Sequence, residues 1–144
     1  MGLDQAMDIS VSGIEAERRT MELISSNIAN INTTRTVYGG PYRRQIAVLQ
    51  EKPLSFAQEL TRAESKLGNS GGVEVVDVVD DTTPFQKVYK PGHPDADSQG
   101  FVQMPNVNLS DEMVDMMYVG KLYEANINAF NATKKMVTDT LTIQ

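Results

Sequence analysis

The sequence predicts an α+β fold in which long N- and C-terminal helices form a coiled-coil-like pair beside a small central β-rich region. Two observations carry this prediction. Apolar residues recur at seven-residue spacing towards each end of the chain, and the middle alternates β-branched runs with glycine and proline turns. We therefore expect an N-terminal assembly helix within 1–35, a β-rich region over 36–108 and a C-terminal assembly helix within 109–144.

The N-terminal helix is expected over residues 4–31, which contain no proline and one glycine, Gly13. Ser10 and Glu17 interrupt its apolar stripe, and the short polar side chains after residue 29 favour a helix end. The stripe consists of Leu3, Met7, Ile14, Met21, Ile24, Ile28 and Ile31.

The central region is predicted to hold short strands separated by turns. A turn at 39–41 precedes the first strand, and a short amphipathic helix is expected over 55–67 before a glycine-rich stretch ends it. The β-branched and alternating runs predict strands over 42–49, 73–79, 85–89 and 101–104. A β unit of this size has little apolar surface of its own, so its core is marginal.

The C-terminal helix is expected from Ser110, a good N-cap that precedes two acidic residues in the first turn. Its apolar stripe consists of Leu109, Met113, Met116, Tyr123, Ile127, Phe130, Val137 and Leu141. Gly120 and Lys134 share the heptad position of Met113. Gly120 would permit close approach of a neighbouring backbone, and Lys134 can extend its charge out of the seam.

Composition argues against several classes of partner. The net charge of −6 is spread evenly along the chain, so nucleic acid and anionic membranes are poor partners. The chain has no cysteine and therefore no disulfide framework. Asp4 and Asp8 stand where a cleaved secretory signal would carry positive charge, and no apolar run approaches the length of a membrane span.

No motif in the sequence predicts catalysis, a metal, a cofactor or a small-molecule substrate. The single histidine, His93, lies in a turn, where a solvated loop residue is the ordinary interpretation. Asp95, Asp97 and Gly100 match the opening of a calcium-binding loop, but Asn106 stands where the bidentate glutamate is required. We therefore expect a protein that is not an enzyme.

The two apolar stripes favour assembly. Two long helices bury little surface by pairing alone, and the β-rich region is too small to cover both. An alternative is a closed helical bundle that binds a client, as an export chaperone or adaptor does, and a discrete soluble oligomer would identify it. A small peptidoglycan-directed enzyme would need positioned acids that the sequence lacks.

One motif at the end of the N-terminal helix resembles the signature of bacterial flagellar rod and hook proteins. It comprises Ser26, Asn27, Ala29, Asn30, Asn32 and Thr33. Three further stretches, 41–45, 88–107 and 123–127 with Lys134, are similar to the proximal rod proteins of this family. Residues 51–72 carry no recognisable family pattern.

The resemblance implies a structural subunit of the proximal rod that polymerises helically into a hollow drive shaft, transmitting torque and passing export substrates. It implies contacts with copies of itself, other rod proteins, the rod-to-membrane-ring adaptor and the export apparatus. Such subunits lie in the basal-body rod, which spans the periplasm, and are exported without a cleaved signal. The C-terminal helix would face the channel, with Asn126, Asn128 and Asn131 as a polar wall.

Overall fold

The computed structural model describes residues 3–53 and 71–142. Their order is α1 (Leu3–Ala29), β1 (Gln45–Glu51), β2 (Val73–Asp80), β3 (Gln86–Tyr89), β4 (Phe101–Met104) and α3 (Leu109–Thr142). The predicted α+β fold with long terminal helices is confirmed. The helix expected over 55–67 lies outside the described residues.

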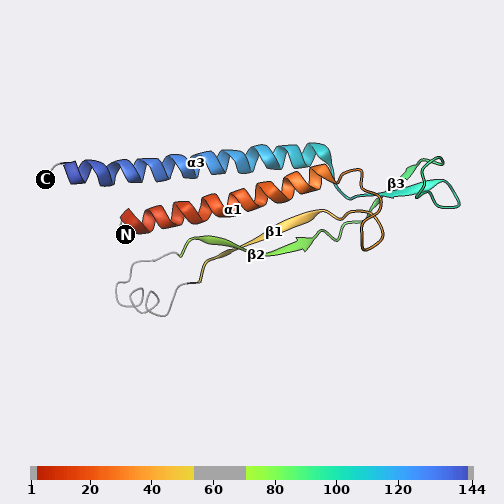
Figure 1. Cartoon of the computed structure of the whole chain (residues 1–144), viewed down its shortest axis with the longest axis horizontal. Helices are drawn as coiled ribbons and strands as arrows, with labels where there is room; N and C mark the ends of the chain where they lie inside the picture. The colour runs from red at the N-terminus through yellow and green to blue at the C-terminus, as the bar shows by residue number, and fades with distance from the viewer. Residues whose placement is uncertain (1–2, 54–70, 143–144) are drawn as a thin grey trace.

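The molecule is elongated and layered (Figure 1). Helix α3 lies along α1, and the β1–β2 ribbon lies along the other side of α1, while β3 and β4 lie at the end of the molecule away from both chain termini. The helices are antiparallel. Asn27 contacts Glu112, whereas Gly13, which is 14 residues earlier in α1, lies beside Asn126, which is 14 residues later in α3. Helix α1 is thus the central layer.

Helix α1 has two packing faces because it is covered on both sides. The predicted stripe includes Ile24, which is buried, but Ala16 and Leu23 are buried as well. These two residues form a second row at seven-residue spacing with Ile9, in addition to the predicted stripe. At the end of this layer Ser12 Oγ accepts a hydrogen bond from Val73 N at 3.1 Å, which ties α1 to β2.

The central region contains two separate antiparallel ribbons. In the first, β1 pairs with β2 so that Ile46 lies opposite Val79, with a bulge after Val48. In the second, β3 pairs with β4 so that Val88 lies opposite Val102. The two pairs share no strand in the described chain, so the β-rich region consists of two ribbons and not of one sheet.

The first strand begins later than predicted, at residue 45 instead of 42. The backbone N–H groups just before it bond elsewhere: Tyr42 N donates to Thr33 O at 2.9 Å and Arg44 N donates to Asn106 Oδ1 at 2.8 Å. The hydrogen bonds between paired strands need these donors. The ribbon therefore starts at residue 45, after the residues whose N–H groups bond elsewhere.

The inner face of α3 differs by one position from the predicted stripe. Asp115, Gly120 and Ile127 are half-buried at its margin. The other buried and half-buried residues form a regular heptad face: Glu112, Met116, Val119, Tyr123, Asn126, Phe130, Thr133 and Val137. Met116, Tyr123, Phe130 and Val137 were predicted, but the other row lies one residue earlier than expected. Consequently Met113 and Leu141 are exposed, and nothing on α1 lies within 4 Å of the place a Gly120 Cβ would take.

Candidate functional site

A cluster of polar side chains joins the end of α1, the segment before β1 and the start of α3. We call Asn27, Tyr42, Arg44, Asn106 and Glu112 the polar junction. Asn27 and Glu112 are fully buried. Because a buried polar group is tolerated only when it is hydrogen-bonded, this cluster must be held in one arrangement.

Asn27 uses its full hydrogen-bonding capacity. Its Nδ2 donates to Gln45 O at 2.9 Å and to Glu112 Oε2 at 3.1 Å. Its Oδ1 accepts from Tyr42 Oη and from Gln45 N, both at 2.9 Å. An amide offers two donors and two acceptor sites, so no other side chain of this size could replace it.

Arg44 carries the positive charge of the junction. Its guanidinium donates to Glu112 Oε1 through Nε and to Asp115 Oδ2 at 2.9 Å, with Asp81 Oδ2 3.9 Å away. Burial lowers the pKa of Arg44, but the hydrogen bond to Glu112 and the three carboxylates outweigh that effect and raise it. Arg44 therefore remains charged and neutralises the buried Glu112.

Asn106 connects the junction to the turn between the two ribbons. Its Oδ1 accepts from Arg44 N, and its Nδ2 donates to Asp81 O at 3.1 Å and to Thr83 Oγ1 at 2.9 Å. The backbone N–H of Thr83 donates to Asp81 Oδ1, and this bond is the main reason why the pKa of Asp81 is lowered. This turn is thereby fixed to the start of α3.

The predicted family motif surrounds this junction. Asn30 Nδ2 caps Ser26 O at 2.9 Å, and Thr33 Oγ1 donates to Asn30 Oδ1 at 3.1 Å. The Ser26 and Tyr42 hydroxyls lie 3.4 Å apart. Ala29 and Asn32, the other two motif residues besides Asn27, are exposed. The motif thus ends α1 and forms the turn that follows it, at the end of the helix pair near the β3–β4 ribbon.

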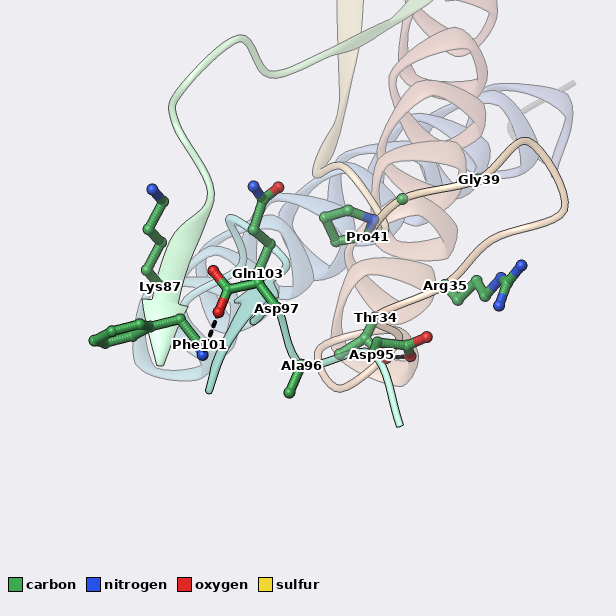
Figure 2. Close-up of a pocket in the computed structure, with 11 residues that line it drawn as sticks. Thr34, Arg35, Gly39, Pro41, Lys87, Asp95, Ala96, Asp97, Phe101 and Gln103 are labelled. Atoms are coloured by element: carbon green, nitrogen blue, oxygen red, sulfur yellow. Dashed lines mark hydrogen bonds between the residues drawn. The ribbon is translucent and has the colours of Figure 1, made fainter. Parts of the chain in front are cut away.

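The distal end of the molecule contains an open cleft of about 490 Å³ (Figure 2). Thr34 Oγ1 donates to Asp95 Oδ2 at 2.8 Å, and Asp97 Oδ1 accepts the backbone N–H groups of Gln99 and Phe101 at 2.9 Å. These carboxylates therefore hold the turn together, while His93 Nδ1 accepts the Asp95 N–H. Among the described residues no group of acidic residues, cysteines or histidine is arranged to hold a metal ion.

Half-buried and exposed positions account for most of the predicted assembly residues. On α1 and the turn after it, Ile24 is buried and Leu3 exposed, whereas Met7, Ile14, Met21, Ile28 and Ile31 are half-buried. On α3, Met113 and Leu141 are exposed, whereas Met116, Gly120, Tyr123, Ile127, Phe130 and Val137 are half-buried. The single chain thus pairs its helices and leaves apolar groups uncovered.

The uncovered apolar groups are densest on the first half of α3. We call this surface the α3 outer patch; it consists of Leu109, Met113, Val114, Met117, Tyr118 and Leu122, each 39–64% exposed. Met113, Val114, Met117 and Tyr118 project away from the inner heptad face. Such a concentration of exposed large apolar side chains is typical of a protein–protein contact.

Sequence reasoning missed most of the polar junction. The sequence predicted Tyr42 and Arg44 only as part of a strand and of a stretch similar to rod proteins. It showed Asn106 only in such a stretch and as a mismatch to a calcium loop, and Glu112 only as an acidic residue in a first helical turn. The available signal was that all four of these residues, with Asn27, lie in or beside recognised motifs. No spacing rule could bring together residues separated by up to 85 positions.

Comparisons with known proteins agree with this architecture at both ends of the chain. The family model described as "Flagella basal body rod protein" matches residues 7–35, and the model described as "Flagellar basal body rod FlgEFG protein C-terminal" matches residues 98–143. These two matches, at the paired terminal helices, place the chain in the class of flagellar basal-body rod proteins.

Full-length relatives narrow the assignment. A "Flagellar basal-body rod protein FlgC" from Bacillus subtilis (strain 168) is 43% identical over 143 residues, covering 96% of this chain and 95% of the relative. Proteins of the same description from Borreliella burgdorferi and Escherichia coli O157:H7 are 38% and 35% identical, each covering 99% of this chain and 98% of the relative. The chain belongs to the FlgC family, and the predicted resemblance is confirmed.

Proposed function

We propose that this protein is a structural subunit of the proximal part of the flagellar rod, which polymerises helically through its terminal helices into a hollow shaft. The observation that carries the proposal is the α3 outer patch, which remains exposed although α1 and α3 are already paired. A contact between different surfaces of identical subunits, repeated without closure, generates a helical polymer. The relatives are named as rod proteins, and none is named as a chaperone or an enzyme.

The polymer would present the polar part of α3 to its channel. Asn128 and Asn131 are exposed and suit a wet wall. Asn126 was expected there as well, but it donates to Glu17 Oε1 at 2.8 Å and so belongs to the contact with α1. The exposed polar groups of the second half of α3 would line a channel through which other chains pass.

Partners and location follow from the same proposal. The subunit would contact copies of itself, other proximal and distal rod proteins, the adaptor to the membrane ring and the export apparatus. It would cross the inner membrane through that apparatus without a cleaved signal and assemble in the periplasm. Within the described residues, neither helix has the length and apolar character of a membrane span.

The test uses charge placed on the outer patch. Val114→Glu with Met117→Glu should leave the helix content of the purified chain unchanged, because both side chains are more than half exposed. The same variant should abolish swimming in a strain that lacks its own family member, and basal bodies isolated from it should lack the rod. Ser25→Glu, which places a charge on an exposed position of α1 outside both the patch and the proposed channel wall, is the control. Normal rods with the Val114/Met117 variant would refute the proposed use of the patch.

A further inference from the structure

We infer that Asn27, Arg44 and Glu112 are positioning residues that lock the register of the helix pair: α3 docks on α1 in one alignment, and only when the segment before β1 is in place. The lock is a property of the single chain. Its consequence for assembly rests on the proposed function, because only a correctly aligned pair presents the outer patch and the ribbons in a repeatable geometry.

The first step is the burial of Glu112. Its side chain is fully buried, and each of its two oxygens has one partner, Arg44 Nε and Asn27 Nδ2. A buried carboxylate without these partners would be strongly unfavourable. The start of α3 can therefore be buried only beside both partners.

The second step is that these partners come from different segments. Asn27 belongs to α1, whereas Arg44 lies between α1 and β1 and is held there by Asn106. Asn27 also bonds the backbone of Gln45 in both directions. No two of the three segments can satisfy each other's buried hydrogen-bonding groups without the third. Docking of α3 on α1 therefore requires the folded 42–45 segment.

The third step is the heptad position of Glu112. In the inner face of α3 it shares a row with Val119 and Asn126. A slip of one heptad, about 10 Å along the axis, would place Val119 opposite Asn27 and remove Glu112 from Arg44. Apolar residues at these positions would tolerate that slip, whereas the polar ones do not.

A second polar layer, two heptads away, supports the same alignment. Asn126 Nδ2 donates to Glu17, and its amide lies over Gly13, where a Cβ would come within 2.8 Å of Nδ2. A side chain at residue 13 would therefore require the Asn126 amide to move. A slip of one heptad would therefore mismatch both layers together, which makes the native register the single satisfied alignment.

The absence of cysteine from the sequence allows the register to be read by introduced disulfides. In the full-length chain, Gly13→Cys is combined with Asn126→Cys for the native register, or with Val119→Cys or Thr133→Cys for slips in either direction. We expect the native disulfide alone with the junction intact. In the variant Asn27→Leu, Arg44→Leu and Glu112→Leu, we expect at least a tenfold rise in one slipped disulfide, identified by mass spectrometry.

The matched control is Glu124→Leu, an exposed acidic residue of α3. A triple variant that forms only the native disulfide would overturn the lock, as would a parent chain that forms native and slipped disulfides equally. These results need no rod, so they are independent of the motility test for the proposed function.

A single substitution keeps the inference testable if the triple variant does not fold. Arg44→Leu should lower hydrogen-exchange protection at least tenfold both at the end of α1 and in the first turns of α3, although Arg44 lies in neither helix. Arg18→Leu, which removes an exposed ion pair within α1, is the control. A loss of protection confined to residues 42–45 would overturn the lock.

Discussion

Asn27 and Glu112 are hydrogen-bonded at 3.1 Å across 85 positions of the chain, and neither side chain is exposed. This contact joins the last turn of α1 to the first turn of α3. Since Asn27 also bonds Gln45, the two helices and the first ribbon meet at one amide. The proposed transmission of torque requires such a joint, because rotation of the helices would have to move the ribbons without slip.

Removal of the buried charge should destabilise the chain strongly. Glu112→Ala leaves a cavity and an unsatisfied Asn27 donor, whereas Arg44 keeps its bond to Asp115. Loss of the buried hydrogen bonds costs about 1–3 kcal/mol. Urea unfolding followed by circular dichroism gives the change. Glu124→Ala removes an exposed pair with Lys121 and should change stability by less than about 0.5 kcal/mol. Equal effects of the two substitutions would contradict the assignment of Glu112.

Asp81 should make stability depend on acid pH. Because its pKa is lowered in the folded chain, chiefly by the Thr83 N–H, ionised Asp81 stabilises the fold. That stabilisation is complete above the unfolded pKa of about 3.9 and is lost as the pH falls through the lowered folded value. The stability difference between the parent and Asp81→Asn should therefore shrink as the pH is lowered below about 4.

The measurement is the urea midpoint of both proteins between about pH 2 and pH 6, the range that brackets the carboxyl titration. Asp77→Asn serves as the control. Asp77 is exposed on β2, and among the residues that the structure describes its carboxylate bonds only to the adjacent Val78 N–H. A constant difference between the parent and Asp81→Asn over this range would show that Asp81 does not carry the effect.

Local pattern predicted the elements well because helices and strands are fixed by neighbours in sequence. Both long helices and the strand of residues 101–104 have the expected bounds within two residues. The inner face of α3 was shifted by one residue because the pattern rewards apolar residues, whereas Glu112 and Asn126 are buried through hydrogen bonds. The second face of α1 was missed because small Ala16 gives a weak apolar signal.

The polar junction could not be predicted from pattern for a different reason. Its members lie in α1, before β1, before α3 and within α3, and their meeting depends on the tertiary path of the chain. The family motifs contained most of these residues, but a sequence motif does not show which residues are in contact in the folded chain. The bonds that Asn27 makes to Tyr42, Gln45 and Glu112 show why these separate motifs belong to one structure.

Glycine should be favoured at position 13 because the Asn126 side chain lies against it, and not because its backbone conformation requires glycine. Gly13→Ala gains up to about 1 kcal/mol in helix propensity but drives the new Cβ towards Asn126 and displaces that amide from Glu17. We expect Gly13→Ala to be neutral or destabilising in the parent and stabilising by up to about 1 kcal/mol in an Asn126→Ala background. Urea unfolding of the four proteins completes the double-mutant cycle. Equal effects in both backgrounds would contradict the close contact.

Deletion of residues 135–144 should abolish rod assembly while leaving the polar junction folded. It removes Val137 from the inner face of α3 and the exposed Leu141, but it leaves the polar junction at the opposite end of the helix pair. We expect the truncated chain to keep hydrogen-exchange protection around Asn27 and Glu112 and to form no rods, measured by electron microscopy of isolated basal bodies. Leu141→Asp in the full-length chain tests the exposed group alone. Rods of normal length from the truncated chain would exclude residues 135–142, the last two turns of α3, from the assembly contact.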